Sequence, residues 1–265
     1  MRRTGIELIG DMSWGTHFCQ FYHTKQDLID ILVPYFRQGL HDNEFCMWIT
    51  SDPLGVEDAK KALRDFVADL DWRIQDGQME ILDCHEWFGR SGAFCADEVM
   101  LKWAHKLDEA FKKGYDGLRL SEDTSWLEKD DWPRFADYEE IVSNVISHYR
   151  MLALCTYSLE KCGAGEVIEV VNNHQLAVIR KSGEWRVIEN SELKKIEKSL
   201  QNSEETFRLL ASNIEQAFWF TTLNPERVVY VNPAFERIWG IPSEKLYQNP
   251  RLWMETIHPD DRARV

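Results

Sequence analysis

The chain lacks the features that would assign it to several common protein classes. Its 265 residues contain no apolar run near the ~20 residues that a membrane-spanning helix needs. No apolar stretch follows the charged start Met-Arg-Arg, so a signal peptide is not expected. The six cysteines include no Cys-x-x-Cys pair, and free thiols fit a reducing compartment. We therefore expect a cytoplasmic protein.

Positive charge is also scarce. The sequence has 31 basic against 45 acidic residues, a net charge of −14. Nucleic acids and anionic membrane surfaces attract basic proteins, so this balance argues against either as a partner.

Phosphate-binding glycine loops are missing as well. The backbone amides of such loops wrap the phosphates of nucleotides. Residues 23–26, after the first predicted strand, read His-Thr-Lys-Gln, and neither Gly-x-x-x-x-Gly-Lys-Ser/Thr nor Gly-x-Gly-x-x-Gly occurs. This argues against ATP hydrolysis. Because hydrolase, zinc-protease and phospho-acceptor motifs are absent too, the sequence assigns the chain no reaction.

What the sequence does contain is an alternation of strand-like and helix-like segments. This alternation predicts an α/β fold, a mostly parallel sheet with helices on both faces. The expected strands are residues 16–22, 45–50, 79–84, 117–121 and 151–158, with a closing hairpin at 176–180 and 184–188. The expected helices are residues 25–39, with Thr24 as N-cap and Gly39 as stop, then 55–69, 93–113, 132–149 and 165–172.

A charged segment without Pro or Gly follows, at residues 190–214. Its apolar or tolerated residues repeat with spacing 3-4-3-4-3-4, which is typical of a heptad seam. Two interpretations are open: an amphipathic linker helix packed on its own domain, or a short parallel coiled coil that joins two copies in a homodimer. The seam residues are Leu193, Ile196, Leu200, Ser203, Phe207, Leu210 and Ile214.

The C-terminal part carries two recognisable stretches. Residues 227–240 read Arg-Val-Val-Tyr-Val-Asn-Pro-Ala-Phe-Glu-Arg-Ile-Trp-Gly, and residues 258–262 read His-Pro-Asp-Asp-Arg. They resemble the first half of a PAS domain, a sensing and signal-relay module. The resemblance implies a truncated PAS domain at 215–265, within a longer protein such as a sensor histidine kinase. We expect Asn232 to cap the helix that begins at Pro233.

The N-terminal part resembles a second family. Residues 17–22 (His-Phe-Cys-Gln-Phe-Tyr), 34–40 (Pro-Tyr-Phe-Arg-Gln-Gly-Leu) and 114–119 (Gly-Tyr-Asp-Gly-Leu-Arg) are similar to the MEDS sensory domain, over most of residues 10–185. The resemblance implies a RecA/KaiC-like fold without a phosphate loop, and a sensor of small hydrocarbon derivatives. The expected domains are thus 1–189 (MEDS-like), 190–214 (signalling helix) and 215–265 (PAS).

A ligand of such a sheet is expected beyond the carboxyl ends of its strands. Arg119 and Glu122 have two open interpretations there, as ligand contacts or as a structural ion pair. The candidate ligand-binding residues are Tyr22, His23, Thr50, Cys84, His85, Trp87, Arg119, Glu122 and Trp126.

The cysteines at 19, 46, 84 and 155 fall in four predicted strands, where small apolar side chains suit a crowded core. The alternative is a metal or redox site that joins Cys84 and His85 to His17, Cys19 or His23. Metal sites usually show closely spaced ligand pairs, so no metal site is predicted. The sequence specifies no cofactor.

The leading hypothesis is a cytosolic sensor that detects a small ligand with its α/β domain and relays the signal through a helix to PAS. The alternative is a divergent KaiC/RecA-like nucleotide-binding protein with an interaction module. A thiol-based redox sensor that uses Cys84 and Cys95 is a third hypothesis.

Overall fold

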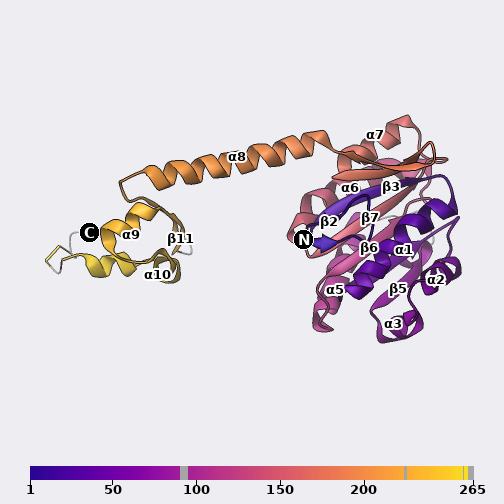
Figure 1. Cartoon of the computed structure of the whole chain (residues 1–265), viewed down its shortest axis with the longest axis horizontal. Helices are drawn as coiled ribbons and strands as arrows, with labels where there is room; N and C mark the ends of the chain where they lie inside the picture. Colours follow the sequence, from indigo (N-terminus) through magenta and orange to yellow (C-terminus); the bar gives the residue numbers. More distant parts are fainter. Residues whose placement is uncertain (90–94, 224–225, 259, 262–265) are drawn as a thin grey trace. The chain divides into compact units, whose positions relative to one another are not determined.

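The computed structural model describes residues 1–89, 95–223, 226–258, 260 and 261, and for residues 191–198, 200, 201 and 223 only the backbone. Contacts divide the chain into two compact units, Met1–Ser191 and Glu192–Val265 (Figure 1). The turn expected at 224–225, and Pro259 and Arg262 of the His-Pro-Asp-Asp-Arg stretch, lie outside the described residues. None of the described helices is both long and apolar enough to span a membrane.

The first unit is built on a seven-stranded sheet. Its neighbouring strands are all parallel except for the hairpin at one edge, between the last two. From edge to edge the strands are β5 (Met79–Asp83), β4 (Phe45–Thr50), β6 (Leu118–Asp123), β7 (Met151–Ser158), β3 (Thr16–Tyr22), β8 (Leu176–Lys181) and β9 (Glu184–Glu189). A separate two-stranded pair joins β1 (Arg2–Arg3) and β2 (Asp11–Met12). The predicted fold class, a mostly parallel sheet with helices, is confirmed.

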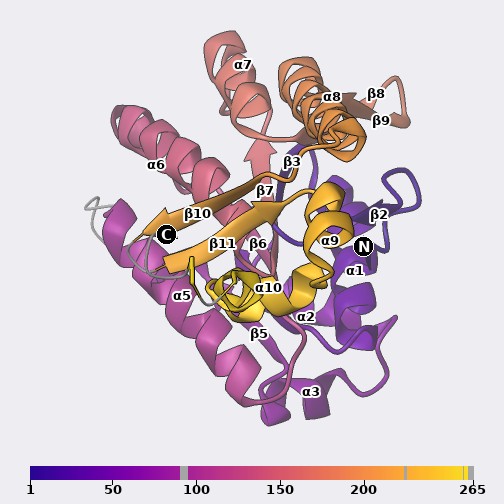
Figure 2. The same ribbon diagram turned by 90° about the vertical axis from the view of Figure 1, so that its left-hand side faces the viewer.

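Helices cover both faces of this sheet (Figure 2). On one face the apolar side chains of α1 (Lys25–His41), α2 (Val56–Arg64) and α3 (Leu70–Asp76) pack against Phe18, Leu152 and Leu154. On the other face lie α4 (Cys84–Phe88), α5 (Ala96–Lys112), α6 (Trp132–Val145) and α7 (Ala164–Asn173). Two short 3-10 turns, Lys129–Asp131 and Ile146–His148, flank α6. Because strand side chains alternate between faces, the strands β3, β4 and β7 each supply both cores.

The first helix begins where the sequence predicts but ends later. Thr24 is its N-cap: the Thr24 hydroxyl accepts from the amide of Asp27, and the Asp27 carboxylate accepts from the amide of Thr24. The expected stop at Gly39 is wrong, since α1 continues to His41. Gly39 instead gives room to Arg119, because a Cβ there would lie 2.6 Å from the Arg119 Cδ.

Two other predicted boundaries also differ. The helix expected over 55–69 ends at Arg64 as α2, and a second helix that was not expected, α3, begins at Leu70. Leu63, Val67 and Leu70 are buried at helical spacing across the break, so apolar periodicity alone could not reveal it. The strand expected to reach Cys84 ends at Asp83, whose carboxylate accepts from the His85 amide and caps α4.

The second unit contains helix α8 (Ser191–Asn213) and a small antiparallel sheet of β10 (Trp219–Leu223) and β11 (Glu226–Val231). Helices α9 (Pro233–Trp239) and α10 (Ser243–Gln248) and the 3-10 turn Leu252–Thr256 follow. Phe235 is fully buried and stacks on Trp239 with 4.9 Å between ring centroids. The expected strand-strand-helix order of this region is observed.

Candidate functional site

Several predicted site residues lie at the carboxyl ends of the strands, around the buried carboxylate of Asp123. Thr156 donates to Asp123 over 2.8 Å, the Ser125 amide donates over 2.9 Å, and the Ser51 hydroxyl also donates to it. Tyr22 and Thr50 end the neighbouring strands and are buried, and Thr50 donates to the Leu82 carbonyl. These bonds satisfy the Asp123 carboxylate and the Thr50 hydroxyl within the chain, which indicates a structural network around Asp123.

The loop where a nucleotide phosphate would bind is closed by the chain's own carboxylate. The amides of His23 and Thr24 both donate to Asp27 Oδ2, at 3.1 and 2.9 Å. A phosphate at this helix start would need those same donors. The His23 side chain is exposed.

Arg119 is not at this edge. It is the second residue of β6, at the amino end, and its guanidinium donates to Glu44 Oε2 over 2.5 Å and to the Tyr35 carbonyl over 2.8 Å. The Arg119–Glu122 pair left open by the sequence is therefore wrong. Residues three apart on a strand point to opposite faces, and Glu122 lies on the α5–α6 face.

The remaining predicted residues belong to α4 and the segment after β6. Trp87 packs edge-on against Trp103, with 5.2 Å between ring centroids, and Trp126 stacks on Phe88 at 4.6 Å. His85 is exposed, and burial raises the pKa of the Cys84 thiol to about 12. A thiol with so high a pKa is a poor nucleophile at neutral pH, which counts against the redox hypothesis.

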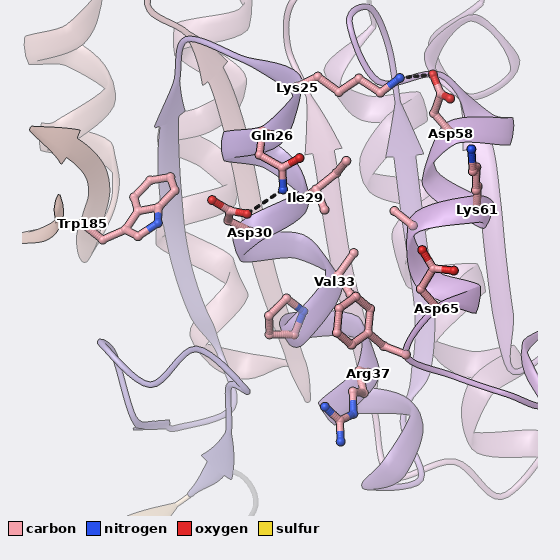
Figure 3. A pocket seen from close by; sticks show the side chains of 13 residues that line it. Lys25, Gln26, Ile29, Asp30, Val33, Arg37, Asp58, Lys61, Asp65 and Trp185 are labelled. Atoms are coloured by element: carbon pink, nitrogen blue, oxygen red, sulfur yellow. Dashed lines mark hydrogen bonds and ion pairs between the residues drawn. The ribbon is translucent and has the colours of Figure 1, made fainter. Parts of the chain in front are cut away.

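A shallow groove lies on the first unit between α1 and α2, and we call it the α1–α2 groove (Figure 3). It has a volume of about 640 Å³. Lys25 pairs with Asp58 across it, and Gln26 donates to Asp30 over 2.8 Å. Both signs of charge line it, so the groove selects no charged ligand. It is lined by Lys25, Gln26, Ile29, Asp30, Val33, Pro34, Arg37, Asp58, Lys61, Ala62, Asp65, Phe66 and Trp185.

A smaller and more apolar pocket lies on the opposite face, where α5 and α6 cover the sheet. This α5–α6 pocket has about 40 Å³ of space for water-sized molecules. Its walls are apolar, and one end carries the polar groups of His17, Glu122 and Cys155. The full lining is His17, Met100, Trp103, Ala104, Leu120, Glu122, Tyr138, Val142, Val145, Ile146, Tyr149, Met151, Ala153 and Cys155.

The polar end of the pocket belongs to a buried cluster formed by His17, Glu139, Cys155 and His174, here called the HECH cluster. His17 Nε2 lies 3.2 Å from Cys155 Sγ and 3.3 Å from Glu139 Oε2. His174 Nε2 lies 3.3 Å from the same Glu139 oxygen. The four residues offer donor atoms that all lie within 4.8 Å of one another, a spacing that could hold a metal ion.

Burial controls the protonation of this cluster. It lowers the pKa of His17 well below its usual range and that of His174 to about 4, so both rings are neutral at pH 7. Burial likewise raises the pKa of Glu122 to about 7, and that of Glu139 well above its usual range, where Glu122 adds to the effect. Such shifts in a pocket are typical of functional sites.

Part of this cluster was predictable from the sequence. His17 and Cys155 both fall in predicted strands, but the metal or redox alternative joined His17 to Cys84 and His85. Glu139 carried a signal, since it falls among Phe135, Tyr138 and Val142 on the apolar stripe of α6. His174 carried none, because it follows α7 in a polar stretch. Asp83, Cys84 and His85 also offer donors within 4.8 Å of one another, but without His17.

The first unit is thus an α/β sheet without a glycine-rich phosphate loop after its first strand, with an apolar pocket on one face. The chain belongs to the MEDS family, because the family described as MEthanogen/methylotroph, DcmR Sensory domain matches residues 16–175. The PAS fold matches residues 228–265. Together the two matches give the chain a sensory signal-transduction role.

Two solved structures are similar to the chain at low identity. One is a KaiC-like protein from the hyperthermophilic archaeon Pyrococcus horikoshii OT3, with 15% identity and a TM-score of 0.47, over 70% of this chain and 84% of that one. The other is the flagellar accessory protein FlaH from Methanocaldococcus jannaschii, with 10% identity and a TM-score of 0.43, over 67% and 78%. No curated protein matches the chain.

Proposed function

We propose that the chain is a sensor that binds a small, mostly apolar molecule in the α5–α6 pocket and passes the signal through α8 to the PAS region. The match of residues 16–175 to a sensory family carries this proposal. The pocket supports it, since apolar walls with a few converging polar groups are what a small-molecule site usually has.

The size of the pocket limits the ligand. A buried water needs roughly 10–15 Å³ of comparable volume, so about 40 Å³ admits a molecule of only a few non-hydrogen atoms. The neutral His17 and the Cys155 thiol supply one polar end, whereas Met100, Leu120 and Met151 supply apolar contact. A one- or two-carbon hydrocarbon derivative with one or two polar or halogen substituents fits this chemistry.

A thermal-shift experiment on the full chain tests the proposal, with dichloromethane, methanol and methylamine as probes. A ligand that binds only the folded state raises Tm in proportion to the logarithm of its concentration. We expect a rise with at least one probe and none with ATP and Mg²⁺. A rise with ATP alone would favour the nucleotide-binding alternative.

Two variants locate the response. Ala104 is exposed at the pocket mouth, so Ala104→Phe closes the pocket with little risk to the fold. Ala62→Phe is the matched control, because Ala62 lines the α1–α2 groove. We expect Ala104→Phe to remove the shift and Ala62→Phe to keep it; the reverse result would place the ligand in the groove and contradict the proposed site.

The relay rests on the expected organisation: a sensory domain at 1–189, a signalling helix at 190–214 and a PAS domain at 215–265. Ligand binding would favour one packing of two α8 helices over another in a homodimer. A cytoplasmic location suits the free, mostly buried thiols. A histidine kinase as output stays a prediction.

A further inference from the structure

The HECH cluster is the strongest unexplained chemical feature of the first unit. Its four side chains come from separate elements: His17 from β3, Cys155 from β7, Glu139 from α6, and His174 from the residue after α7. All four are buried, with at most 3% of any residue exposed. Bringing two imidazoles, a carboxyl and a thiol together inside an apolar core is costly unless they bind something.

We propose that the HECH cluster binds a single divalent transition-metal ion, of the class to which zinc(II) and iron(II) belong. Imidazole nitrogen, thiolate sulfur and carboxylate oxygen are the usual ligands of such ions. Bonds of about 2.0–2.3 Å in tetrahedral geometry separate the ligand atoms by about 3.3–3.8 Å. The separations of 3.2 Å between His17 and Cys155, and 3.3 Å between each histidine and Glu139, already approach this spacing.

The orientation of His174 supports a metal ligand. Its Nδ1 lies 2.7 Å from the Val170 carbonyl, which can only accept, so Nδ1 carries the proton. In the neutral ring Nε2 then presents a lone pair, and it faces the Glu139 carboxyl. A backbone carbonyl that fixes the tautomer through the far nitrogen is the usual outer contact of a metal-binding histidine.

Polar atoms of the cluster that lack hydrogen-bond partners also support a bound metal ion. Among the residues that the structure describes, no donor meets hydrogen-bond geometry at either Glu139 oxygen, at His174 Nε2 or at His17 Nδ1, although Tyr157 and Cys155 lie close to the Glu139 carboxyl. Glu139 and Glu122 also form no salt bridge to a described lysine or arginine. A divalent ion would satisfy the inward-facing atoms and offset the buried negative charge at once.

The ion would lie beside the α5–α6 pocket, because His17 and Cys155 line both. It would therefore give the pocket an electrophilic end. The inference does not depend on the proposed function, since metal binding is measured without any organic ligand.

The test uses the full chain, free of any tag, stripped with a chelator and reloaded with zinc(II) or cobalt(II). We expect one ion per chain by elemental analysis. Cobalt should give the strong d–d absorption of a tetrahedral site together with a thiolate-to-cobalt charge-transfer band. Less than a tenth of an ion per chain, or a cobalt spectrum without a thiolate band, would overturn the proposal and leave a cluster that only shares protons.

Three cysteine variants assign the thiolate. Cys155→Ser should abolish the charge-transfer band and weaken zinc binding at least tenfold. Cys46→Ser is the matched control, a buried thiol on the opposite face of the sheet, and should change neither. Cys84→Ser tests whether the metal binds instead to the group formed by Asp83, Cys84 and His85. If Cys84→Ser loses the charge-transfer band and Cys155→Ser keeps it, the HECH site is refuted.

Discussion

Glu44 and Arg119 form an ion pair that is completely buried. Arg119 donates in addition to the backbone carbonyls of Arg3, Thr4 and Tyr35, so its guanidinium ties the N-terminal segment and α1 to the sheet. Arg2 also pairs with Glu44, at 2.7 Å. The residue that the sequence offered as a ligand contact thus holds the fold together.

Removing the negative charge from this pair should destabilise the protein. In Glu44→Gln, Arg119 loses its counter-ion and stays charged inside the core, whereas Arg2 keeps its ion pair with Asp116. Breaking a buried pair on one side typically costs about 3–5 kcal/mol, so we expect a loss of that size in urea unfolding followed by tryptophan fluorescence. Glu57→Gln, at an exposed surface pair, should change the free energy of unfolding by under about 0.5 kcal/mol. Equal effects of the two variants would contradict this structural role.

The face on which a side chain lies could be predicted from the sequence only where a local pattern, such as strand alternation or a helical stripe, determines it. Strand alternation alone separates Arg119 from Glu122, and the stripe on α6 singles out Glu139. The pairing of Arg119 with Glu44 and of His174 with Glu139 depends on tertiary contacts 75 and 35 positions apart, which no local pattern encodes. Of the predicted ligand contacts, Arg119 lies at the amino end of β6 and not at the carboxyl edge, and the others stay predictions.

At the scale of elements, strands were predicted better than helix ends. Each strand of the parallel sheet is a short apolar run between polar loops, so its existence follows from the sequence. Helix ends depend on caps and on neighbours, as Gly39 and the α2–α3 break show. Asn232 is a further case: it is the N-cap of α9 by position, but its side chain makes no capping bond.

The Asn232 side chain instead joins the end of α8 to the small sheet. It is almost fully buried, accepts from the Phe218 amide over 3.0 Å and donates to the Gln216 carbonyl over 2.9 Å. Its amide also reaches the Ala211 carbonyl, at 3.4 Å. This contact between α8 and the small sheet is therefore a route by which a change in the packing of α8 can be transmitted to the PAS region.

Asn232→Ala should loosen that contact without unfolding α9. Leaving buried backbone groups unsatisfied costs about 1–3 kcal/mol, so amide hydrogens of residues 211–218 should exchange roughly 5- to 150-fold faster. Asn249→Ala is the control, an exposed asparagine of the same unit whose side chain accepts only from the Arg251 amide. Unchanged exchange at 211–218 in Asn232→Ala would show that the side chain does not hold the helix.

At the scale of the whole molecule, the open question is whether the functional particle contains two chains. The side chains of Leu193, Ile196 and Leu200 lie outside the described residues, but the later seam is described. Leu210 is 63% exposed and leaves apolar surface on α8 open to a second copy, whereas Phe207 is 45% exposed and its ring also packs on Tyr230, with 5.1 Å between centroids. A parallel pair would set the same seam residue of each chain face to face.

Leu209 and Leu210 provide a test of that seam within one turn of helix. Both are about equally exposed, at 66% and 63%, but only Leu210 falls on the heptad positions. Leu210→Glu should place two like charges in the interface and raise the dimer dissociation constant at least tenfold in analytical ultracentrifugation, whereas Leu209→Glu should leave it unchanged. In a Cys95→Ser background, Ser203→Cys should oxidise to a covalent dimer, because a parallel in-register pair brings residue 203 of the two chains together. If Leu209→Glu and Leu210→Glu weaken the dimer equally, the dimer contact does not follow the heptad seam. If the unmodified chain is a monomer at every concentration, α8 is a linker helix and not a dimer interface.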